Sequence, residues 1–181
     1  MKTNKKTSLS YIAFETPLGW ILVAESRDGI ALVDFLAPDR PLRDAAISAV
    51  RKVYPDAAPA PGTDSDLLEK TKGYILDYLT NRVPPPKIPI DLSKGTPFDH
   101  KVWRSIETIA FGESKSYGQI AVETQSPGAS RAVGRACGRN PVPILIPCHR
   151  VIASGGKLGG FAGGLEIKRA LLDLEKSQAK D

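Results

Sequence analysis

Residues 116–139 read SYGQIAVETQSPGASRAVGRACGR, and this stretch decides how the C-terminal half of the chain folds. The pattern predicts a short helix from Ser116 or Tyr117 to Thr124 and another from Ala129 to Gly138. Ser126-Pro127-Gly128 between them has the composition of a tight turn. Two short helices across a glycine-containing turn are typical of a helix-turn-helix motif, although an ordinary helical hairpin has the same spacing.

The second predicted helix separates charge from apolar surface. Arginines stand four residues apart and share one face: Arg131, Arg135 and Arg139. Small and apolar residues repeat at the same spacing on the opposite face: Ala129, Val133 and Cys137. No acidic residue occurs in 124–165, whereas solvated helix faces usually mix both signs. We interpret the arginine face as a surface for a nucleic-acid backbone, with a solvated charged face as the alternative.

Charge and hydropathy agree with this interpretation. The net charge is +5, and most of the excess lies in residues 95–181. The sequence holds no apolar run of about 18 residues or more, which argues against a membrane span. No apolar core of a signal peptide follows the N-terminus, so we expect an unexported protein, cytoplasmic or, in a eukaryote, nuclear. In that compartment the two cysteines are expected to be reduced.

The N-terminal half has a different pattern. Strand-like segments cover residues 9–17, 20–24 and 30–35, and tight turns between them indicate an antiparallel meander. Helical periodicity follows over 42–54 and 64–82, with Asp64 or Ser65 as the N-cap of the second helix.

A proline-rich stretch divides the chain. Pro84-Pro85-Pro86 ends the second helix and begins an extended connection to about residue 95. Thr96-Pro97 then opens a new helix. The sequence therefore predicts an α/β protein with an N-terminal domain at 1–95 and a mostly helical domain at 96–181.

The segment 140–150, NPVPILIPCHR, presents a cysteine beside a histidine. Residues 140–147 are apolar, and their prolines predict a stiff, extended approach to Cys148. A thiol attacks as its thiolate, which needs a nearby base or cation, and His149 could act directly or through a water. A buried structural cysteine is the alternative, and it is our interpretation of Cys137. The few Cys and His residues lack zinc-ligand spacing, so no metal site is predicted.

Residues 153–164 form a glycine-rich segment, ASGGKLGGFAGG. Such a loop can bring backbone amides close to a ligand, but the sequence lacks the Gly-Lys-Ser/Thr of a Walker motif. A helix from Leu165 to Glu175 is expected after it, and Glu175 is either solvated or orients a catalytic group.

The segment NPVPILIPCHRV (140–151) strongly resembles the active-site signature of the O6-alkylguanine-DNA alkyltransferases, also called methylated-DNA–protein-cysteine methyltransferases. The resemblance extends from about Thr96 to Glu175 and includes SYGQIA (116–121), RAVG (131–134) and the glycine-rich loop. The N-terminal half matches only in length and in its strand-then-helix order. The resemblance implies a ribonuclease-H-like N-terminal meander with helices, followed by a winged helix-turn-helix-like domain.

The resemblance also implies roles for single residues. Cys148 would accept an alkyl group, His149 would take its proton through a water, and Glu175 would orient the imidazole. Tyr117 would contact the backbone beside a flipped nucleotide and protonate the departing guanine. Arg131 would fill the space that the base leaves, and Asn140 would brace the active-site segment. The family pattern further places Ala129, Arg135 and Ser154 at the DNA, and Val151, Phe161, Ala162 and Pro143 around the base.

The implied function is direct DNA repair. An alkyl group would move irreversibly from O6-alkylguanine, and by extension O4-alkylthymine, in double-stranded DNA to Cys148, with base flipping and without a cofactor. A monomer in solution that can bind DNA cooperatively is expected. Phe161 and Ala162 stand where family members often have hydroxyl groups, which leaves the substrate range open. The sequence also lacks the cysteines of the N-terminal zinc site that some members carry.

Three alternatives remain. An alkyltransferase-like lesion-binding protein would lack the cysteine, and Cys148 argues against it. A cysteine hydrolase using Cys148 and His149 would leave the arginine row unexplained. A transcription regulator would need a further domain.

Overall fold

The computed structural model describes residues 8–37 and 39–176. Strands β1 (Ser8–Thr16), β2 (Gly19–Ser26) and β3 (Gly29–Leu36) form the predicted antiparallel meander. A short strand that the sequence did not predict, β4 (Ala58–Pro61), pairs in parallel with β1 and gives the order β3-β2-β1-β4. Its sequence, Ala-Pro-Ala-Pro, is tolerated because prolines at a sheet edge need not donate to the ladder.

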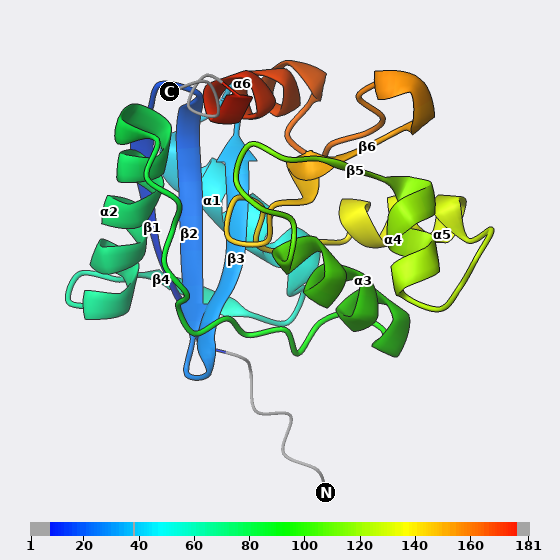
Figure 1. Ribbon diagram of the computed structural model, residues 1–181. Coiled ribbons are helices and arrows are strands. Elements are labelled where there is room, and N and C mark those ends of the chain that lie inside the picture. The colour runs from blue at the N-terminus through cyan, green and yellow to red at the C-terminus, as the bar shows by residue number, and fades with distance from the viewer. Residues whose placement is uncertain (1–7, 38, 177–181) are drawn as a thin grey trace, which may run out of the picture.

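Two helices cover opposite faces of this sheet (Figure 1). Strand residues alternate in direction, so Ile21 and Val23 join the core beneath α2 (Asp66–Asn81), while Leu22 and Ala24 join the core beneath α1 (Leu42–Val53). Ser65, one of the two predicted caps, accepts a hydrogen bond from the Leu68 amide at 3.2 Å. Both predicted helices are confirmed, and the chain has the predicted α/β class.

The C-terminal half is mostly helical, as expected. Helix α3 (Pro97–Glu107) begins with a capping box between Thr96 and Asp99. Helices α4 (Tyr117–Glu123) and α5 (Ser130–Gly138) flank the predicted turn, and α6 (Leu165–Lys176) closes the described chain. Two single-turn 3-10 helices, η1 (Cys148–Arg150) and η2 (Ser154–Gly156), and a parallel strand pair, β5 (Lys115–Ser116) with β6 (Val151–Ile152), complete this half. The strand pair was not predicted, because two-residue strands carry no periodicity.

The core beneath α2 continues into the C-terminal half. Leu68 and Ile75 of α2 belong to the same buried cluster as Trp103 and Ile106 of α3. The two halves of the chain thus share one core. Three expectations stay predictions: a domain boundary at residue 95, a ribonuclease-H-like N-terminal half and a winged C-terminal half. Among the described residues, no helix has both the length and the apolar character that a membrane crossing requires.

Candidate active site

The segment before Cys148 is a tight loop, which corrects the prediction of an extended approach. The Ile146 amide donates to the Val142 carbonyl at 2.9 Å, and Ile144 adopts a left-handed φ of 74°. The Asn140 side chain sits within the loop, where Nδ2 donates to Ile146 O at 2.8 Å and Oδ1 accepts from Val142 N at 3.1 Å. Prolines did not prevent the turn, because a fixed φ near −65° suits turns as well as extended chain. Asn140 holds this loop closed.

Cys148 lies at the start of η1 and is 5% exposed. Burial raises the pKa of its thiol, while a hydrogen bond from Asn140 and the nearby Lys168 ammonium group act in the opposite direction. Neither Cys148 nor Cys137 forms a disulfide. Burial and the neighbouring Cys148 raise the pKa of Cys137 to about 12, so this second thiol stays protonated at neutral pH.

His149 and Glu175 form a buried pair. His149 Nε2 lies 2.8 Å from Glu175 Oε1, and the two side chains are 0% and 1% exposed. Burial lowers the pKa of His149, which keeps the ring neutral at pH 7. The carboxylate can only accept, so the ring proton sits on Nε2 and Nδ1 carries a lone pair. His149 Nδ1 is buried and has no hydrogen-bond partner among the described residues. This arrangement gives the ring an unoccupied basic nitrogen.

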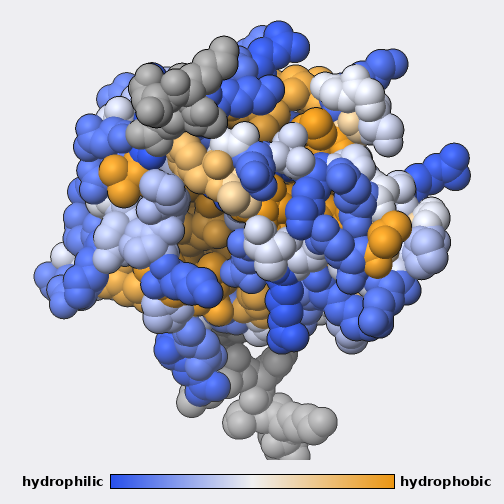
Figure 2. Space-filling view, viewed as in Figure 1, coloured by the Kyte–Doolittle hydropathy of each residue, from blue (hydrophilic) through white to orange (hydrophobic). Residues whose placement is uncertain are grey.

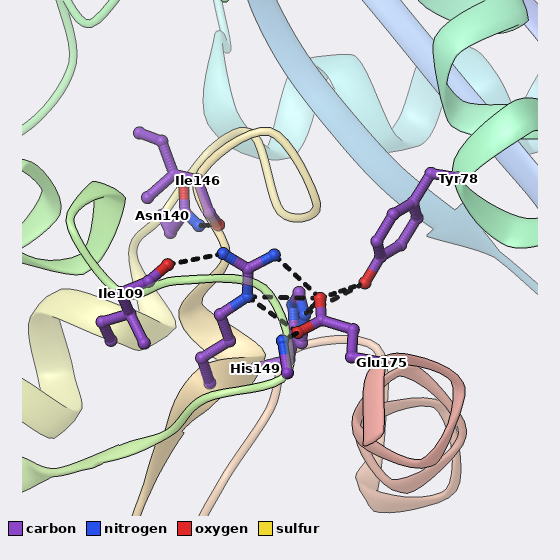
Figure 3. A network of polar contacts seen from close by, with 8 residues as sticks. Tyr78, Ile109, Asn140, Ile146, His149 and Glu175 are labelled. Carbon is purple, nitrogen blue, oxygen red and sulfur yellow. Dashed lines mark hydrogen bonds and ion pairs between the residues drawn. The ribbon is translucent and has the colours of Figure 1, made fainter. Parts of the chain in front are cut away.

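Glu175 has further partners that the sequence did not indicate (Figure 3). Arg150 donates through Nε to Oε2 and through Nη2 to Oε1, both at 2.9 Å, and Tyr78 donates to Oε1 at 2.6 Å. The Gly112 amide donates to Oε2 at 3.1 Å. Burial by itself would raise the pKa of Glu175, but hydrogen bonds from His149 and the other donors lower it to about 2. Arg150 adjoins His149 in sequence and could have been suspected, whereas Tyr78 stands 71 residues away with no local signal.

Lys168 is a second buried group that the sequence analysis missed. Its side chain lies on α6, is 0% exposed, and donates to Val151 O at 2.7 Å and Gly160 O at 3.2 Å. Its ammonium group also lies 5.8 Å from the centre of the Tyr117 ring. Lys168 stands three and four residues before Leu171 and Leu172, so helical spacing places it on the buried face of α6, but the sequence does not show what it binds. In the structure it ties the glycine-rich loop to β6.

Tyr117 begins α4 and lies against the same loop. A Cβ atom on Gly159 would come within 2.6 Å of the Tyr117 hydroxyl, so this approach requires glycine. Burial, together with the neighbouring cysteines, raises the pKa of Tyr117 to about 12. The phenol therefore stays protonated at neutral pH and can act as a donor.

One arginine of the predicted basic face also pairs within the fold. Arg131, Arg135 and Arg139 are all exposed, and Arg139 Nε donates to Asp99 Oδ2 of α3 at 3.0 Å. Asp99 is fully buried and its side chain requires a cation, so Arg139 is committed to the fold. The opposite face is as expected, with Val133 and Cys137 buried. Ala129 is half-buried at the start of α5, and Ser154 is exposed at the start of η2.

Three of the four predicted pocket residues lie at or beside one cavity, and the fourth, Val151, lies in the core. Pro143 and Ala162 line a cavity of about 330 Å³ together with Asn140, Gly163 and Phe35 of β3. Phe161 packs edge-on against Phe35, with ring centres 6.0 Å apart. Val151 belongs to the core instead, and its carbonyl accepts from Lys168. Within residues 8–37 and 39–176, no cluster of His, Cys, Asp and Glu is suited to a metal ion.

Comparison with known proteins shows which sequences and folds this chain is similar to. The family model described as "6-O-methylguanine DNA methyltransferase, DNA binding domain" matches residues 97–177. A methylated-DNA–protein-cysteine methyltransferase of Mycobacterium tuberculosis is 47% identical over 121 residues, which cover 67% of this chain and 70% of that protein. A methyltransferase of the same name from Methanosarcina acetivorans is 35% identical and covers 92% of this chain and 98% of its own length.

Solved structures agree with the sequence relatives. The crystal structure of Mycobacterium tuberculosis OGT in complex with DNA matches with a TM-score of 0.75 and 34% identity, over 93% of this chain and 94% of that one. The likeness thus includes the N-terminal half, where the sequence resemblance was weak.

Proposed function

Because the chain belongs to the methylated-DNA–protein-cysteine methyltransferase family, we propose that Cys148 takes the alkyl group from O6-alkylguanine in double-stranded DNA, once per molecule. The observation that carries this proposal is the buried cysteine beside a neutral histidine whose Nδ1 has no hydrogen-bond partner in the described part of the chain. O4-alkylthymine is a second substrate of the same chemistry.

Activation of the thiol starts the reaction. The His149 Nδ1 lone pair takes the Cys148 proton through a water, and Glu175 stabilises the imidazolium at Nε2. Asn140 and Lys168 stabilise the thiolate. The charge-stabilising groups are all buried, so they act in a low-dielectric site where their effect is strong.

Transfer is an in-line displacement. Cys148 Sγ forms a bond to the alkyl carbon while the bond between that carbon and guanine O6 breaks. Tyr117, a protonated phenol, can donate a proton so that guanine leaves as the neutral base. The thioether that forms is not cleaved by water, so the thiol of Cys148 is not regenerated.

Access to the buried sulfur requires base flipping. Cys148 is 5% exposed, so a stacked base cannot reach it and must rotate out of the duplex, at a cost of a few kcal/mol. We propose that α4 and α5 form a helix-turn-helix that enters the minor groove, with Arg131 filling the vacated space and Arg135, Ala129 and Ser154 at the backbone. Small residues keep α5 thin enough for close approach, and Pro143, Ala162 and Phe161 would surround the extruded base.

The remaining expectations belong to this proposal. They are a monomer in solution that can bind DNA cooperatively, a cytoplasmic location, and alkyl transfer without a cofactor.

A transfer assay tests the proposal. Duplex DNA with radiolabelled O6-methylguanine is mixed with the protein, and label is expected on the protein at no more than one equivalent. Cys148→Ala should abolish transfer, whereas Cys137→Ala, which removes the other buried thiol, should retain it. Both variants should keep the DNA affinity of the wild type.

Two outcomes would favour the alternatives. A lesion-binding protein gains no methyl mass on the protein, which mass spectrometry resolves. A cysteine hydrolase turns over an activated ester repeatedly without DNA, and more than one transfer per molecule would also contradict consumption of Cys148.

A further inference from the structure

Tyr78 brings a hydroxyl group from the N-terminal half of the chain to the buried His149–Glu175 pair (Figure 3). Its oxygen donates to Glu175 Oε1 at 2.6 Å and lies 3.2 Å from His149 Nε2. His149 Nε2 lies 2.8 Å from the same carboxylate oxygen. The hydroxyl and the imidazole therefore share a single oxygen atom of Glu175.

The position of this hydroxyl is fixed by packing. Tyr78 is 1% exposed on the inner face of α2, and its ring packs edge-on against Phe111 with centres 6.1 Å apart. Burial and the adjacent Glu175 charge raise the pKa of Tyr78, so the phenol stays protonated. Tyr78 is thus a permanent donor to Glu175.

We propose that Tyr78 is a positioning residue for alkyl transfer, which keeps His149 neutral by sharing Glu175 Oε1 with it. This role rests on the proposed function above, because a neutral His149 is what accepts the proton of Cys148. The N-terminal half would then contribute to the chemistry as well as to the core.

The physical reason lies in how the carboxylate divides its charge. An oxygen that accepts a hydrogen bond from a hydroxyl group stabilises a neighbouring imidazolium less. His149 is faced by Glu175 and Lys168 from α6, by Tyr78 from α2, and by Arg150 beside it in η1. Burial and the two cations disfavour the imidazolium, and Glu175 alone among these groups favours it. Loss of the hydroxyl would strengthen Glu175 as a partner and stabilise the proton on His149.

Tyr78→Phe tests this role, with Tyr54→Phe as the matched control. The Tyr54 hydroxyl is also buried and donates to Ala31 O at 3.2 Å, but it lies in the other core cluster. Ring-labelled histidine allows the protonation of His149 to be followed by NMR in a pH series, with the half-buried His100, which lies in α3, as an internal reference. The rate at which iodoacetamide alkylates Cys148 is measured in the same series.

Two changes are expected in Tyr78→Phe. The protonation midpoint of His149 should rise by at least about 0.5 pH unit, a roughly threefold change in its protonation equilibrium. The pH below which the rates of the iodoacetamide reaction and of labelled alkyl transfer fall, the acid limb of each profile, should also rise. Tyr54→Phe should leave the His149 midpoint and both acid limbs unchanged.

The opposite result is equally clear. In Tyr78→Phe, the protonation midpoint of His149 and the acid limbs of both reactions could match the wild type or move to lower pH. If the free energy of unfolding also falls as it does in Tyr54→Phe, then Tyr78 contributes only packing. The NMR and iodoacetamide measurements need no DNA, so they decide on Tyr78 separately. Absence of labelled transfer by the wild type would instead refute the proposed function.

Discussion

Glu175 concentrates more hydrogen bonds than any other site residue described above. Its two oxygens accept from Tyr78, His149, Arg150 and the Gly112 amide, and the side chain is 1% exposed. A buried carboxylate in such surroundings is stable only while its donors remain. The ionised form therefore has consequences for folding as well as for the orientation of His149.

Glu175→Gln should lower the free energy of unfolding at pH 7 by about 3–5 kcal/mol, because it leaves Arg150 buried without its charge partner. The pKa of Glu175 is lowered from 4.5 to about 2 in the folded protein. The stabilisation from its ionised form is therefore fully present above about pH 4.5 and is lost as the pH falls towards 2. Urea unfolding at pH 7, 4.5 and 3 should show the gap between wild type and variant narrowing.

Glu69→Gln is the matched control. Glu69 pairs with Lys72 on the exposed surface of α2, so this change should cost no more than about 0.5 kcal/mol at any of these pH values. A gap between wild type and Glu175→Gln that stays constant from pH 7 to pH 3 would contradict the lowered pKa.

Sequence reasoning at this scale identified residues whose neighbours along the chain carry a signal. Cys148, His149 and Asn140 belong to one segment, whereas helical periodicity left the role of Glu175 open and only the family resemblance assigned it. Tyr78 and Lys168 were missed because their roles depend on contacts between elements. Periodicity places both on helices, but it does not reveal what lies opposite.

At the scale of elements, α5 carries two kinds of arginine. Arg131, Arg135 and Arg139 are all exposed, but Arg139, which follows the last residue of α5, also binds Asp99 of the α3 capping box. The spacing of four residues could not separate these uses, because all three share a face and the difference comes from α3. The elements themselves were largely predictable, since caps, prolines and apolar periodicity are local signals. β4, β5 and β6 are short and depend on their pairing partners.

DNA binding distinguishes the two kinds of arginine. Arg135→Ala should weaken binding to all duplex sequences alike and reduce the slope of log affinity against log salt by about 1, the loss of one phosphate contact. Arg139→Ala should leave that slope unchanged, because its guanidinium is already paired with Asp99. Fluorescence anisotropy between 50 and 200 mM salt measures both slopes. Equal loss of slope in the two variants would show that Arg139 also contacts DNA.

At the scale of the whole molecule, polar residues dominate the face shown in Figure 2, with hydrophobic residues gathered in a recess near its centre. Behind this surface the two halves of the chain share one buried cluster that joins β2, α2 and α3. The sequence suggested separate domains because the proline-rich stretch is a strong local break. Proline fixes the backbone locally, however, and does not determine whether the flanking elements pack together.

The shared core predicts one cooperative unfolding transition. Trp20 lies in β2 and Trp103 in α3, so Trp20→Phe leaves a single reporter in the C-terminal half. In this variant, the urea midpoint from Trp103 fluorescence should coincide with the midpoint from far-UV circular dichroism. Two separate midpoints would instead support independent domains that meet near residue 95.

The ammonium group of Lys168 has a consequence for the kinetics of recognition. By donating to Val151 O in β6 and to Gly160 O within the glycine-rich loop, it holds the loop against the strand that precedes it, and this loop has a large conformational entropy to lose. That entropy is lost during folding, so association with DNA need not order the loop again. A damaged base that rotates out of the duplex then contacts a loop that already has its bound conformation. The rate of lesion binding should therefore be limited by rotation of the base, with no separate step for closing the loop.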